Sequence, residues 1–443
     1  MIQQICNLLV NKRILILGFG REGKSTYRFL RKHFPDKIIG IYDKSGVKES
    51  LPNTQIYSGN SYEDILPEYD MVIKSPGIVL NLKDHSQIEK FSSQTDLFLH
   101  FYGSQTIGIT GTKGKSTTSS LLNHILRHAS KESILVGNIG VPVFDMLDNI
   151  NQKTIVVFEL SSHQLEYVKH SPHYAVLLNI FQEHLDHYGT FEKYKQAKEN
   201  IYKYQQKGDV LLYNPQFFQL DNSCDMNTIT ITNDGMDADV VVEENHINLQ
   251  NEVITIIENE IHLMGNHNIY NIAVTYAITK SFGISKEDFM DAIKTFQPLP
   301  HRMEFVTEQN GVKFYNDSIS TICETTMNNV NSVDDVDTVI LGGMDRGIDY
   351  QPLVDFLIES DIRNIILMPD TGYRIEKLLL ASDKKSKEQK LYMVSGVEEA
   401  VELAKRETRR GTTCLFSPAA ASYGFFKNFE ERGETFKKFV LGI

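Results

Sequence analysis

The middle of this chain is built around one glycine-rich stretch, Gly108-Ile109-Thr110-Gly111-Thr112-Lys113-Gly114-Lys115-Ser116-Thr117-Thr118. On either side of it, residues 106–109 predict a buried strand, and residues 119–128 carry leucine and isoleucine at helical spacing. A strand, a glycine-rich loop and a helix in this order turn backbone N–H groups toward a phosphate. The stretch therefore predicts a phosphate-binding loop.

The side chains of this loop agree with that prediction. Lys115 supplies a positive charge, and the hydroxyl of Ser116 or Thr117 can hold Mg²⁺. The strict P-loop pattern has a glycine five residues before Gly114, where this chain has Ile109, so the loop is a variant of that pattern. The competing interpretation, an ordinary strand-to-helix turn, leaves the charge and the hydroxyls unexplained.

Length and composition exclude several classes of protein. The 443 residues suggest about two to four domains, and a hydrophobic content of 41% is that of a globular chain. The net charge of −12 argues against non-specific nucleic-acid binding. The four cysteines form no CxxC pair, so we expect neither a zinc knuckle nor a disulfide framework, and the cytoplasm is the simplest location. No stretch approaches the roughly 18 apolar residues of a membrane helix, and residues 1–10 lack the basic start of a signal peptide.

A second glycine-rich turn lies near the start of the chain. The strand-like residues 13–17 lead into Gly18-Phe19-Gly20-Arg21-Glu22-Gly23, a helical pattern over residues 24–33, and a strand over residues 38–42 that ends at Asp43. This is the dinucleotide fingerprint, and by itself it predicts NAD or NADP. It indicates a nucleotide or its diphosphate more strongly than a nicotinamide, and glycines that serve only packing are the alternative. A strand over residues 71–74 runs into Ser75-Pro76-Gly77, a further strand end where ligands bind in open α/β sheets.

Charged residues also follow two strands after the phosphate-binding loop. The strand 155–158 ends at Glu159, where an acid that binds Mg²⁺ or orients water belongs, although a helix cap or a solvated carboxylate is the alternative. The strand 174–180 leads to Glu183, His184 and Asp186, which favour a hard-cation site with one histidine over a zinc site. A helix over residues 188–204 then carries Lys198.

The rest of the chain indicates two further regions. Short alternating runs between residues 209 and 263 predict a small antiparallel sheet attached to the α/β core. Asn268 and Asn271, at the start of an apolar helix, fit either helix caps or contacts to an adenine edge. Strands at 312–315, 338–341, 364–367, 391–394 and 414–416 alternate with helices and predict a further parallel α/β domain that ends in a helix over residues 425–440. Residues 85–100 are expected to cross from the first domain to the next.

Eight of these stretches, in this order, resemble the Mur ligases over essentially the whole chain. The matching stretches are residues 110–118, 137–140, 159–165, 179–186, 265–271, 299–302, 316–318 and 417–433. Within that family, Asn428-Phe429-Glu430-Glu431-Arg432-Gly433 resembles the branch that adds D-glutamate to UDP-N-acetylmuramoyl-L-alanine in peptidoglycan precursor synthesis. The resemblance implies three α/β domains: a Rossmann-like UDP-binding domain (1–98), a central P-loop ATP-binding domain with the small antiparallel sheet (99–299), and a Rossmann-like amino-acid-binding domain (300–443).

The resemblance also implies a reaction and its participants. The enzyme would be an ATP-dependent amide-bond-forming ligase, a monomer with two Mg²⁺ sites, that works through an acyl phosphate. Lys115, Glu159, His184 and Lys198 would be catalytic. Mg²⁺ would be held by Ser116, Glu159, His184 and Lys198, the last as a carbamate formed with CO₂ on a partly buried neutral amine.

Two sets of binding residues follow from the same resemblance. ATP would be bound by Gly111, Thr112, Lys113, Gly114, Lys115, Ser116, Thr117, Asn268, Asn271, Arg302 and Asp317. The sugar nucleotide and the amino acid would be bound by Gly20, Arg21, Glu22, Asp43, Lys44, Ser75, Gly77, Asn138, Ser161, Gln164, Thr321, Arg346, Ser422 and Phe429.

This chain departs from the family pattern at the acceptor side. It has Asp317-Ser318-Ile319-Ser320-Thr321-Ile322 where the relatives usually have Asp-Ser-Lys-Ala-Thr-Asn, so a lysine is missing. One lost charge-assisted contact costs about 1.5–3 kcal/mol, which is enough to change substrate preference, and Arg346 is the expected substitute cation. His163 stands where the family often has phenylalanine. The alternatives are a Mur-type ligase that adds L-glutamate or another amino acid, a non-catalytic nucleotide-binding protein, and an NAD(P)-dependent oxidoreductase, which leaves the second phosphate loop unexplained.

Overall fold

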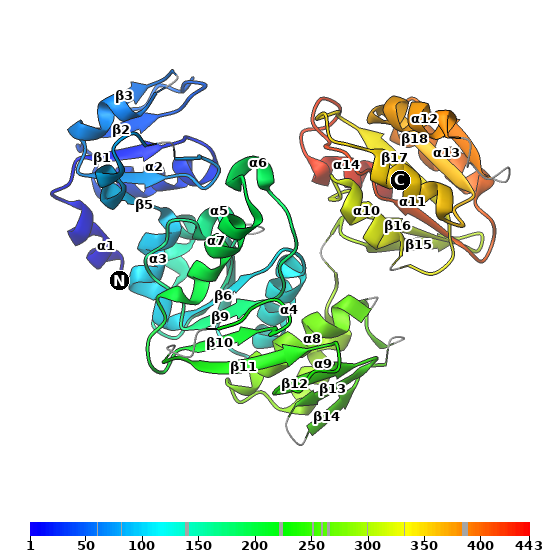
Figure 1. Cartoon of the computed structure of the whole chain (residues 1–443), viewed down its shortest axis with the longest axis horizontal. Helices are drawn as coiled ribbons and strands as arrows, with labels where there is room; N and C mark the ends of the chain where they lie inside the picture. The colour runs from blue at the N-terminus through cyan, green and yellow to red at the C-terminus, as the bar shows by residue number, and fades with distance from the viewer. Residues whose placement is uncertain are drawn as a thin grey trace. The chain divides into compact units, whose positions relative to one another are not determined.

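The computed structural model describes residues 1–443 except 60, 81, 138–140, 221–224, 250–251, 258–259, 264–265, 299, 332 and 383–388. The chain forms two compact units (Figure 1). The first contains Met1–Ile257 and His267–Thr295, and the second contains Glu258–Asn266 and Phe296–Ile443.

The first unit begins with a parallel sheet of the dinucleotide-binding type. Its strand order is β3-β2-β1-β4-β5, with the bounds β1 (Ile14–Leu17), β2 (Ile39–Tyr42), β3 (Thr54–Tyr57), β4 (Met71–Lys74) and β5 (Phe91–Ser92). The helical segments around it are α1 (Ile2–Leu9), α2 (Arg21–His33), η1 (Glu63–Glu68) and η2 (His85–Lys90). The strands β1, β2 and β4 are buried at every position, as expected of parallel strands covered on both faces.

A second, larger sheet follows in the same unit, in the order β14-β13-β12-β11-β10-β9-β6-β8-β7. The strands are β6 (Thr106–Thr110), β7 (Ser133–Gly137), β8 (Ile155–Glu159), β9 (Tyr174–Leu177), β10 (Val210–Tyr213), β11 (Asn227–Thr232), β12 (Val240–Glu243), β13 (His246–Leu249) and β14 (Glu252–Thr255). The helical segments are α3 (Gln94–Tyr102), η3 (Gly103–Gln105), α4 (Lys115–His128), η4 (Val143–Asn149), α5 (Ser162–Leu165), α6 (Leu185–Tyr188), α7 (Phe191–Lys203), α8 (Asn266–Lys280) and α9 (Lys286–Thr295).

One hydrophobic core joins these two sheets. It runs from Ile14 and Phe29 of the first sheet and its helix α2, through Phe98 of α3 and Phe144 of η4, to Phe158 of β8. The rings of Phe29 and Phe144 lie 4.7 Å apart between their centroids. Because the core is continuous, the two sheets belong to one compact unit.

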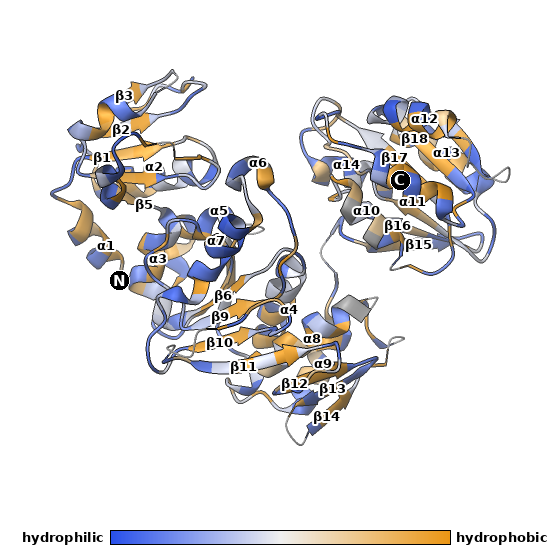
Figure 2. Ribbon diagram, in the orientation of Figure 1, coloured by the Kyte–Doolittle hydropathy of each residue, from blue (hydrophilic) through white to orange (hydrophobic). Residues whose placement is uncertain are grey.

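The second unit holds a six-stranded sheet in the order β15-β16-β20-β17-β18-β19. Its strands are β15 (Glu304–Gln309), β16 (Val312–Asn316), β17 (Val336–Gly343), β18 (Asn364–Asp370), β19 (Lys390–Met393) and β20 (Thr413–Phe416). Its helices are α10 (Cys323–Val330), α11 (Gln351–Glu359), α12 (Thr371–Ala381), α13 (Val397–Glu407) and α14 (Phe429–Leu441). Successive residues of the inner strands point to opposite faces of the sheet and pack into two separate hydrophobic cores. Helices α10, α11 and α12 cover one of these faces, and α13 and α14 cover the other. The inner strands are accordingly the most hydrophobic ribbons of this unit (Figure 2).

The α/β fold class predicted from the sequence is confirmed, with three differences in detail. The small antiparallel sheet comprises only β12–β14, because β10 and β11 pair in parallel and continue the central sheet. The helix predicted over residues 188–204 begins later, as α7 at Phe191, because Gly189, with a φ of +73°, separates it from the short helix α6. Residues 85–100 form η2, β5 and most of α3, so they are more than the crossing that we predicted. The division into domains 1–98, 99–299 and 300–443 stays a prediction.

Candidate active site

The phosphate-binding loop lies between β6 and α4, as predicted. Gly114 has a φ of +84°, and a Cβ atom built there would lie 2.6 Å from Oδ1 of Asn271, so that position requires glycine. Ile109, which occupies the place of the strict P-loop glycine, lies inside β6 and is completely buried. The missing glycine is therefore explained by a strand that extends further toward the loop.

The segment after β9 holds this loop in place. The backbone N–H of Lys113 donates to Oδ1 of Asn179 at 2.9 Å, and Nδ2 of Asn179 donates to the Lys113 carbonyl at 3.1 Å. The hydroxyls of Thr112 and Tyr194 lie 2.9 Å apart. The Lys115 ammonium donates to the carbonyl oxygens of Gly111 and Thr112, each at 2.8 Å, so its charge stays over the loop.

The predicted cation ligands come from elements around the same loop. Strand register pairs Glu159 with Ile109, so the completely buried Glu159 lies beside the entry to the loop. Ser116 is buried in the first turn of α4, and His184 precedes α6 with a φ of +57°. Within the described ranges, no three His, Cys, Asp or Glu side chains group into a metal site by themselves. A hydroxyl and a buried carboxylate are nevertheless donors that suit Mg²⁺, which commonly completes its shell with water and substrate phosphate.

Lys198 on α7 is another lysine beside this loop, and unlike Lys115 it is buried. Its side chain is 1% exposed, and its Nζ donates to the Gly111 carbonyl at 2.7 Å. The ammonium also lies 5.0 Å from the ring centroid of Tyr194. Burial, with the nearby Lys115 charge as the next cause, holds the pKa of Lys198 well below its usual value. Lys198 is therefore an amine that can be neutral and nucleophilic.

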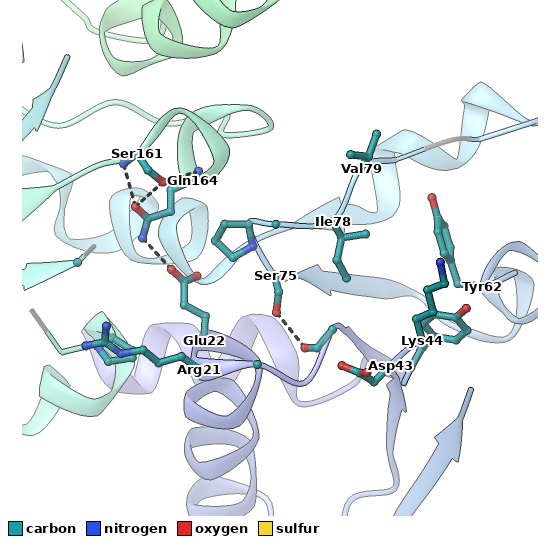
Figure 3. Close-up of a pocket in the computed structure, with 17 residues that line it drawn as sticks. Arg21, Glu22, Asp43, Lys44, Tyr62, Ser75, Ile78, Val79, Ser161 and Gln164 are labelled. Atoms are coloured by element: carbon teal, nitrogen blue, oxygen red, sulfur yellow. Dashed lines mark hydrogen bonds between the residues drawn. The ribbon is translucent and has the colours of Figure 1, made fainter. Parts of the chain in front are cut away.

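A cavity of about 740 Å³ lies beside the first glycine-rich turn (Figure 3). Nine of the predicted substrate-binding residues line it: Gly20, Arg21, Glu22, Asp43, Lys44, Ser75, Gly77, Ser161 and Gln164. Sequence reasoning missed the wall residues Tyr42, Tyr62, Ile78 and Val79. Tyr42 and Ile78 adjoin predicted turns and could have been found from their position, but nothing in the sequence marked Tyr62.

Backbone contacts shape the turns around this cavity. Asp43 accepts from the backbone N–H of Phe19 at 2.8 Å and from that of Ser45 at 3.0 Å. The Ser75 hydroxyl donates to the Gly18 carbonyl at 2.9 Å. A Cβ atom on Gly23 would lie 2.0 Å from that same carbonyl oxygen, so the fingerprint glycine is required for packing as well.

Glu22 links the cavity to the segment that follows Glu159. It accepts from Nε2 of Gln164 at 2.7 Å, and Oε1 of Gln164 accepts from the backbone N–H and the hydroxyl of Ser161 at 2.9 and 3.0 Å (Figure 3). Burial raises the pKa of the Glu22 carboxyl. Its other oxygen, Oε2, is buried with no hydrogen-bond partner among the residues that the structure describes. The described residues therefore satisfy only one of the two carboxylate oxygens of Glu22.

Asn268 and Asn271 lie near the phosphate-binding loop. Asn271 accepts from the hydroxyl of Thr118 on α4 at 3.1 Å and donates to Oδ1 of Asn268 at 3.0 Å. Asn271 therefore contacts the helix that follows the loop, and Asn268 is hydrogen-bonded to Asn271. Asn138, another predicted substrate-binding residue, lies outside the described residues.

The remaining predicted residues belong to the second unit. Asp317 follows β16, is completely buried, and accepts from Ser417 Oγ at 2.7 Å and Asn329 Nδ2 at 2.6 Å; burial raises its pKa. Arg302, Thr321 and Phe429 are half-buried, Ser422 is buried, and Arg346 is exposed. The Met344 N–H donates to the Ala421 carbonyl at 2.9 Å, which brings the loops of Arg346 and Ser422 side by side.

Sequence reasoning missed the role of Arg432 in this unit. Arg432 is 1% exposed and donates to the hydroxyl and carbonyl of Ser318 at 3.0 and 2.6 Å and to the carbonyl of Ala420 at 2.9 Å. It therefore ties α14 to the two loops that carry Thr321 and Ser422. A basic residue inside the 428–433 stretch was the only signal in the sequence.

Comparison with known proteins decides the family. The family model named Mur ligase middle domain matches residues 109–279. The UDP-N-acetylmuramoylalanine–D-glutamate ligase of Caldicellulosiruptor bescii is 31% identical over 462 aligned positions, which cover 98% of each chain. This chain belongs to the D-glutamate-adding branch of the Mur ligase family. The predicted family and the prediction of an ATP-dependent amide-bond-forming ligase are confirmed.

Solved structures of Mur ligases share the fold of this ligase. The UDP-N-acetylmuramate–alanine ligase MurC of Thermotoga maritima has a TM-score of 0.59 at 16% identity, over 98% of this chain and 100% of that one. The MurF ligase of the same organism, solved in complex with ADP, has a TM-score of 0.57 at 16% identity, over 92% of this chain and 96% of that one. The oxidoreductase alternative, which rested on the first glycine-rich turn alone, is left without support.

Proposed function

We propose that this ligase joins D-glutamate to UDP-N-acetylmuramoyl-L-alanine in peptidoglycan precursor synthesis, with ATP as the second substrate. The observation that carries the proposal is that the segment 159–164 takes part in both sites of the first unit. Glu159 borders the phosphate-binding loop, whereas Ser161 and Gln164 line the cavity beside the first glycine-rich turn. A substrate that fills the cavity can therefore present its reacting end to a phosphate held by the loop.

The reaction takes place in two displacements. A carboxylate oxygen of the L-alanyl group attacks the γ-phosphorus of ATP, the bond to the leaving oxygen breaks, and ADP leaves an acyl phosphate. The amine nitrogen of D-glutamate then attacks the acyl carbon, loses a proton and expels inorganic phosphate. Little covalent help is needed from the protein, whose work is to position the groups and neutralise charge.

The loop residues 111–117 are the proposed ATP site. Backbone N–H groups at the start of α4 and the Lys115 ammonium would face the β- and γ-phosphates. Asn271 contacts this helix and holds Asn268 beside it, which supports their proposed place near the nucleotide. Arg302 and Asp317, which belong to the second unit, are also proposed to bind ATP.

The donor set beside the loop suits Mg²⁺. Ser116, Glu159 and His184 would hold one ion, and a carbamate on Lys198 would support a second. When bound, Mg²⁺ neutralises charge on the phosphate oxygens during transfer. The buried amine of Lys198 supports the carbamate proposal, because its neutral form can add to CO₂ and release a proton.

The cavity of the first unit is the proposed site of the sugar nucleotide. Arg21 and Lys44 supply positive charge for a diphosphate, and Tyr62 with Ile78 supplies an apolar wall for a base. The unpartnered oxygen of Glu22 would accept from a hydroxyl or amide N–H of the sugar nucleotide. Asn138 is proposed to face the same substrate.

The proposed amino-acid site lies in the second unit and consists of Thr321, Arg346, Ser422 and Phe429. The exposed guanidinium of Arg346 is the proposed partner of the glutamate side-chain carboxylate. Ile319 in place of the usual lysine favours one second candidate, a ligase of the same type that accepts L-glutamate.

We further propose a monomer with the three domains 1–98, 99–299 and 300–443, working in the cytoplasm. Buried free thiols at Cys6, Cys323 and Cys414 support a reducing location. In the described part of the chain, no helix has the length and apolar character to cross a membrane.

The test is phosphate release by the purified chain with ATP, Mg²⁺ and UDP-N-acetylmuramoyl-L-alanine, comparing D-glutamate with L-glutamate. Release that depends on D-glutamate is the expected result. A preference for L-glutamate would move the chain to the second candidate, and no release with either amino acid would overturn the proposal.

A further inference from the structure

The short helix α5 makes two polar contacts with the first sheet and its helix. Gln164, within α5, donates to Glu22 of α2 at 2.7 Å. Glu166, the residue after α5, lies 3.9 Å from the ammonium of Lys74, the last residue of β4. Since Glu159 is only three residues before α5, both contacts act on the segment that carries the proposed cation ligand.

Lys74 also holds one wall of the cavity. Its side chain is 3% exposed, and its Nζ donates to the carbonyls of Ser75 and Pro76 at 3.3 and 3.0 Å. It lies 5.0 Å from the ring centroid of Tyr167. The Ser75-Pro76-Gly77 turn, which lines the cavity, is thereby attached to a buried cation that no step of the proposed reaction uses.

Glu166 extends this chain of contacts toward the other proposed cation ligand. Its Oε2 lies 3.1 Å from Nε2 of His187, and the side chain of His187 is 8% exposed. His187 is in α6, whose N-cap is His184, and its backbone N–H donates to the His184 carbonyl at 3.0 Å. One line of contacts therefore runs from the cavity turn through Lys74, Glu166 and His187 to His184.

The Lys74–Glu166 pair, with side chains 3% and 17% exposed, is much less exposed to solvent than a second ion pair in the same unit. Lys32 of α2 pairs with Asp148 of η4 at 2.5 Å, with side chains 56% and 66% exposed. An exposed pair contributes little to stability and holds neither partner in a fixed place. A pair with one buried partner, such as Lys74, loses much of its attraction to desolvation, but a movement that separates the charges leaves the buried ammonium without its carboxylate.

We propose that Lys74 and Glu166 are positioning residues that couple occupation of the sugar-nucleotide cavity to the placement of Glu159 and His184. The two ligands would then bind cooperatively, each raising the affinity of the other by the same factor. The inference rests on the proposed function and adds to it a residue pair that touches neither substrate.

The test measures the affinity of the full chain for the Mg²⁺ complex of a non-hydrolysable ATP analogue, with and without saturating UDP-N-acetylmuramoyl-L-alanine. In the wild type we expect the sugar nucleotide to tighten binding of the analogue by about fivefold, the lower end of usual coupling between sites. In Lys74→Met and in the near-isosteric Glu166→Gln, this ratio of the affinities with and without sugar nucleotide should fall toward one. Lys32→Met is the matched control and should keep the wild-type factor.

The outcomes separate this inference from the proposed function. If the sugar nucleotide binds the wild type but does not raise its affinity for the ATP analogue, the inference alone is overturned. The inference is also overturned if both variants keep the wild-type ratio of affinities, or if Lys32→Met loses as much of that ratio as they do. If Lys74→Met does not fold, Glu166→Gln decides. A wild type that binds no sugar nucleotide overturns the proposed function, and with it the inference.

Discussion

The first unit contains two glycine-rich turns that share one backbone arrangement but carry different side chains. Each follows a central parallel strand, β1 or β6, and leads into a helix, and each has a glycine with positive φ, +91° at Gly18 and +84° at Gly114. The first helix begins with Arg21 and Glu22 at the edge of a cavity, whereas the second begins with Lys115 and Ser116 beside the buried Glu159. The backbone layout is common to sites for phosphate groups, and the side chains decide which molecule is bound.

The largest expected effect is on the rate of phosphate release, and it compares a lysine substitution at each of the two turns. Lys115→Ala should lower kcat of phosphate release by about 100-fold, since a hydrogen bond to a charged group is worth about 1.5–3 kcal/mol and tenfold corresponds to about 1.4 kcal/mol. The affinity for the sugar nucleotide, measured by calorimetric titration, should not change. Lys24→Ala, in the first turn of α2, is the control and should leave both quantities near wild type. An equal loss of kcat in both variants would remove the distinction between the turns.

The second prediction concerns the buried amine beside the phosphate-binding loop. Lys198→Ala should lower kcat by about 10- to 100-fold through loss of one charged ligand, and a short carboxylate such as acetate should restore part of it. Lys193→Ala, on the exposed face of the same helix, should retain full activity without additive. Full activity of Lys198→Ala in the absence of carboxylate would contradict the carbamate.

A smaller effect is expected at the first turn. The Asp43 carboxylate accepts a hydrogen bond from the backbone N–H of Phe19 at 2.8 Å, and Asp43 lines the cavity. Asp43→Ala should raise the KM for the sugar nucleotide by about tenfold, the loss expected for one hydrogen bond to a charged group, and leave the KM for ATP unchanged. Steady-state kinetics with each substrate varied in turn would show this. A rise in the KM for ATP instead would mean that the two turns share one ligand.

The smallest effect is a pH dependence of stability. Burial lowers the pKa of Lys74 to about 8 from an ordinary value of 10.5. Between those values the unfolded chain binds more protons than the folded chain, so this lysine makes folding more favourable as pH rises from about 8 to about 10. Urea unfolding at pH 7.5 and 9.5 should show the wild type gaining about 1–2 kcal/mol relative to Lys74→Met. If the free energy of unfolding changes equally with pH in the two proteins, burial does not lower the pKa of Lys74, and the prediction is contradicted.

Sequence reasoning succeeded where a residue type is fixed by backbone geometry. Gly23 and Gly114 were found because the turns leave no room for a side chain, and Glu159 because it ends a buried strand next to the loop. The strand 71–74 was predicted with the bounds that the structure has.

Contacts between distant segments could not be predicted in the same way. Lys74 and Glu166 are 92 positions apart, and neither belongs to a motif. Arg432 is buried against Ser318 and Ala420, although an arginine near a helix start is ordinarily solvated. The sequence also could not distinguish a dinucleotide from a sugar nucleotide. The glycine fingerprint predicts only the shape of the turn, and nothing in the sequence around Tyr62 indicates that this residue lines the cavity.

The most direct test of this account is a titration of UDP-N-acetylmuramoyl-L-alanine into the purified chain, with and without a saturating Mg²⁺ complex of a non-hydrolysable ATP analogue. If the two turns serve two different ligands, one equivalent of sugar nucleotide binds in both cases, and the ATP analogue does not displace it. Displacement of the sugar nucleotide by the analogue would show that both molecules compete for one turn, which would contradict the account.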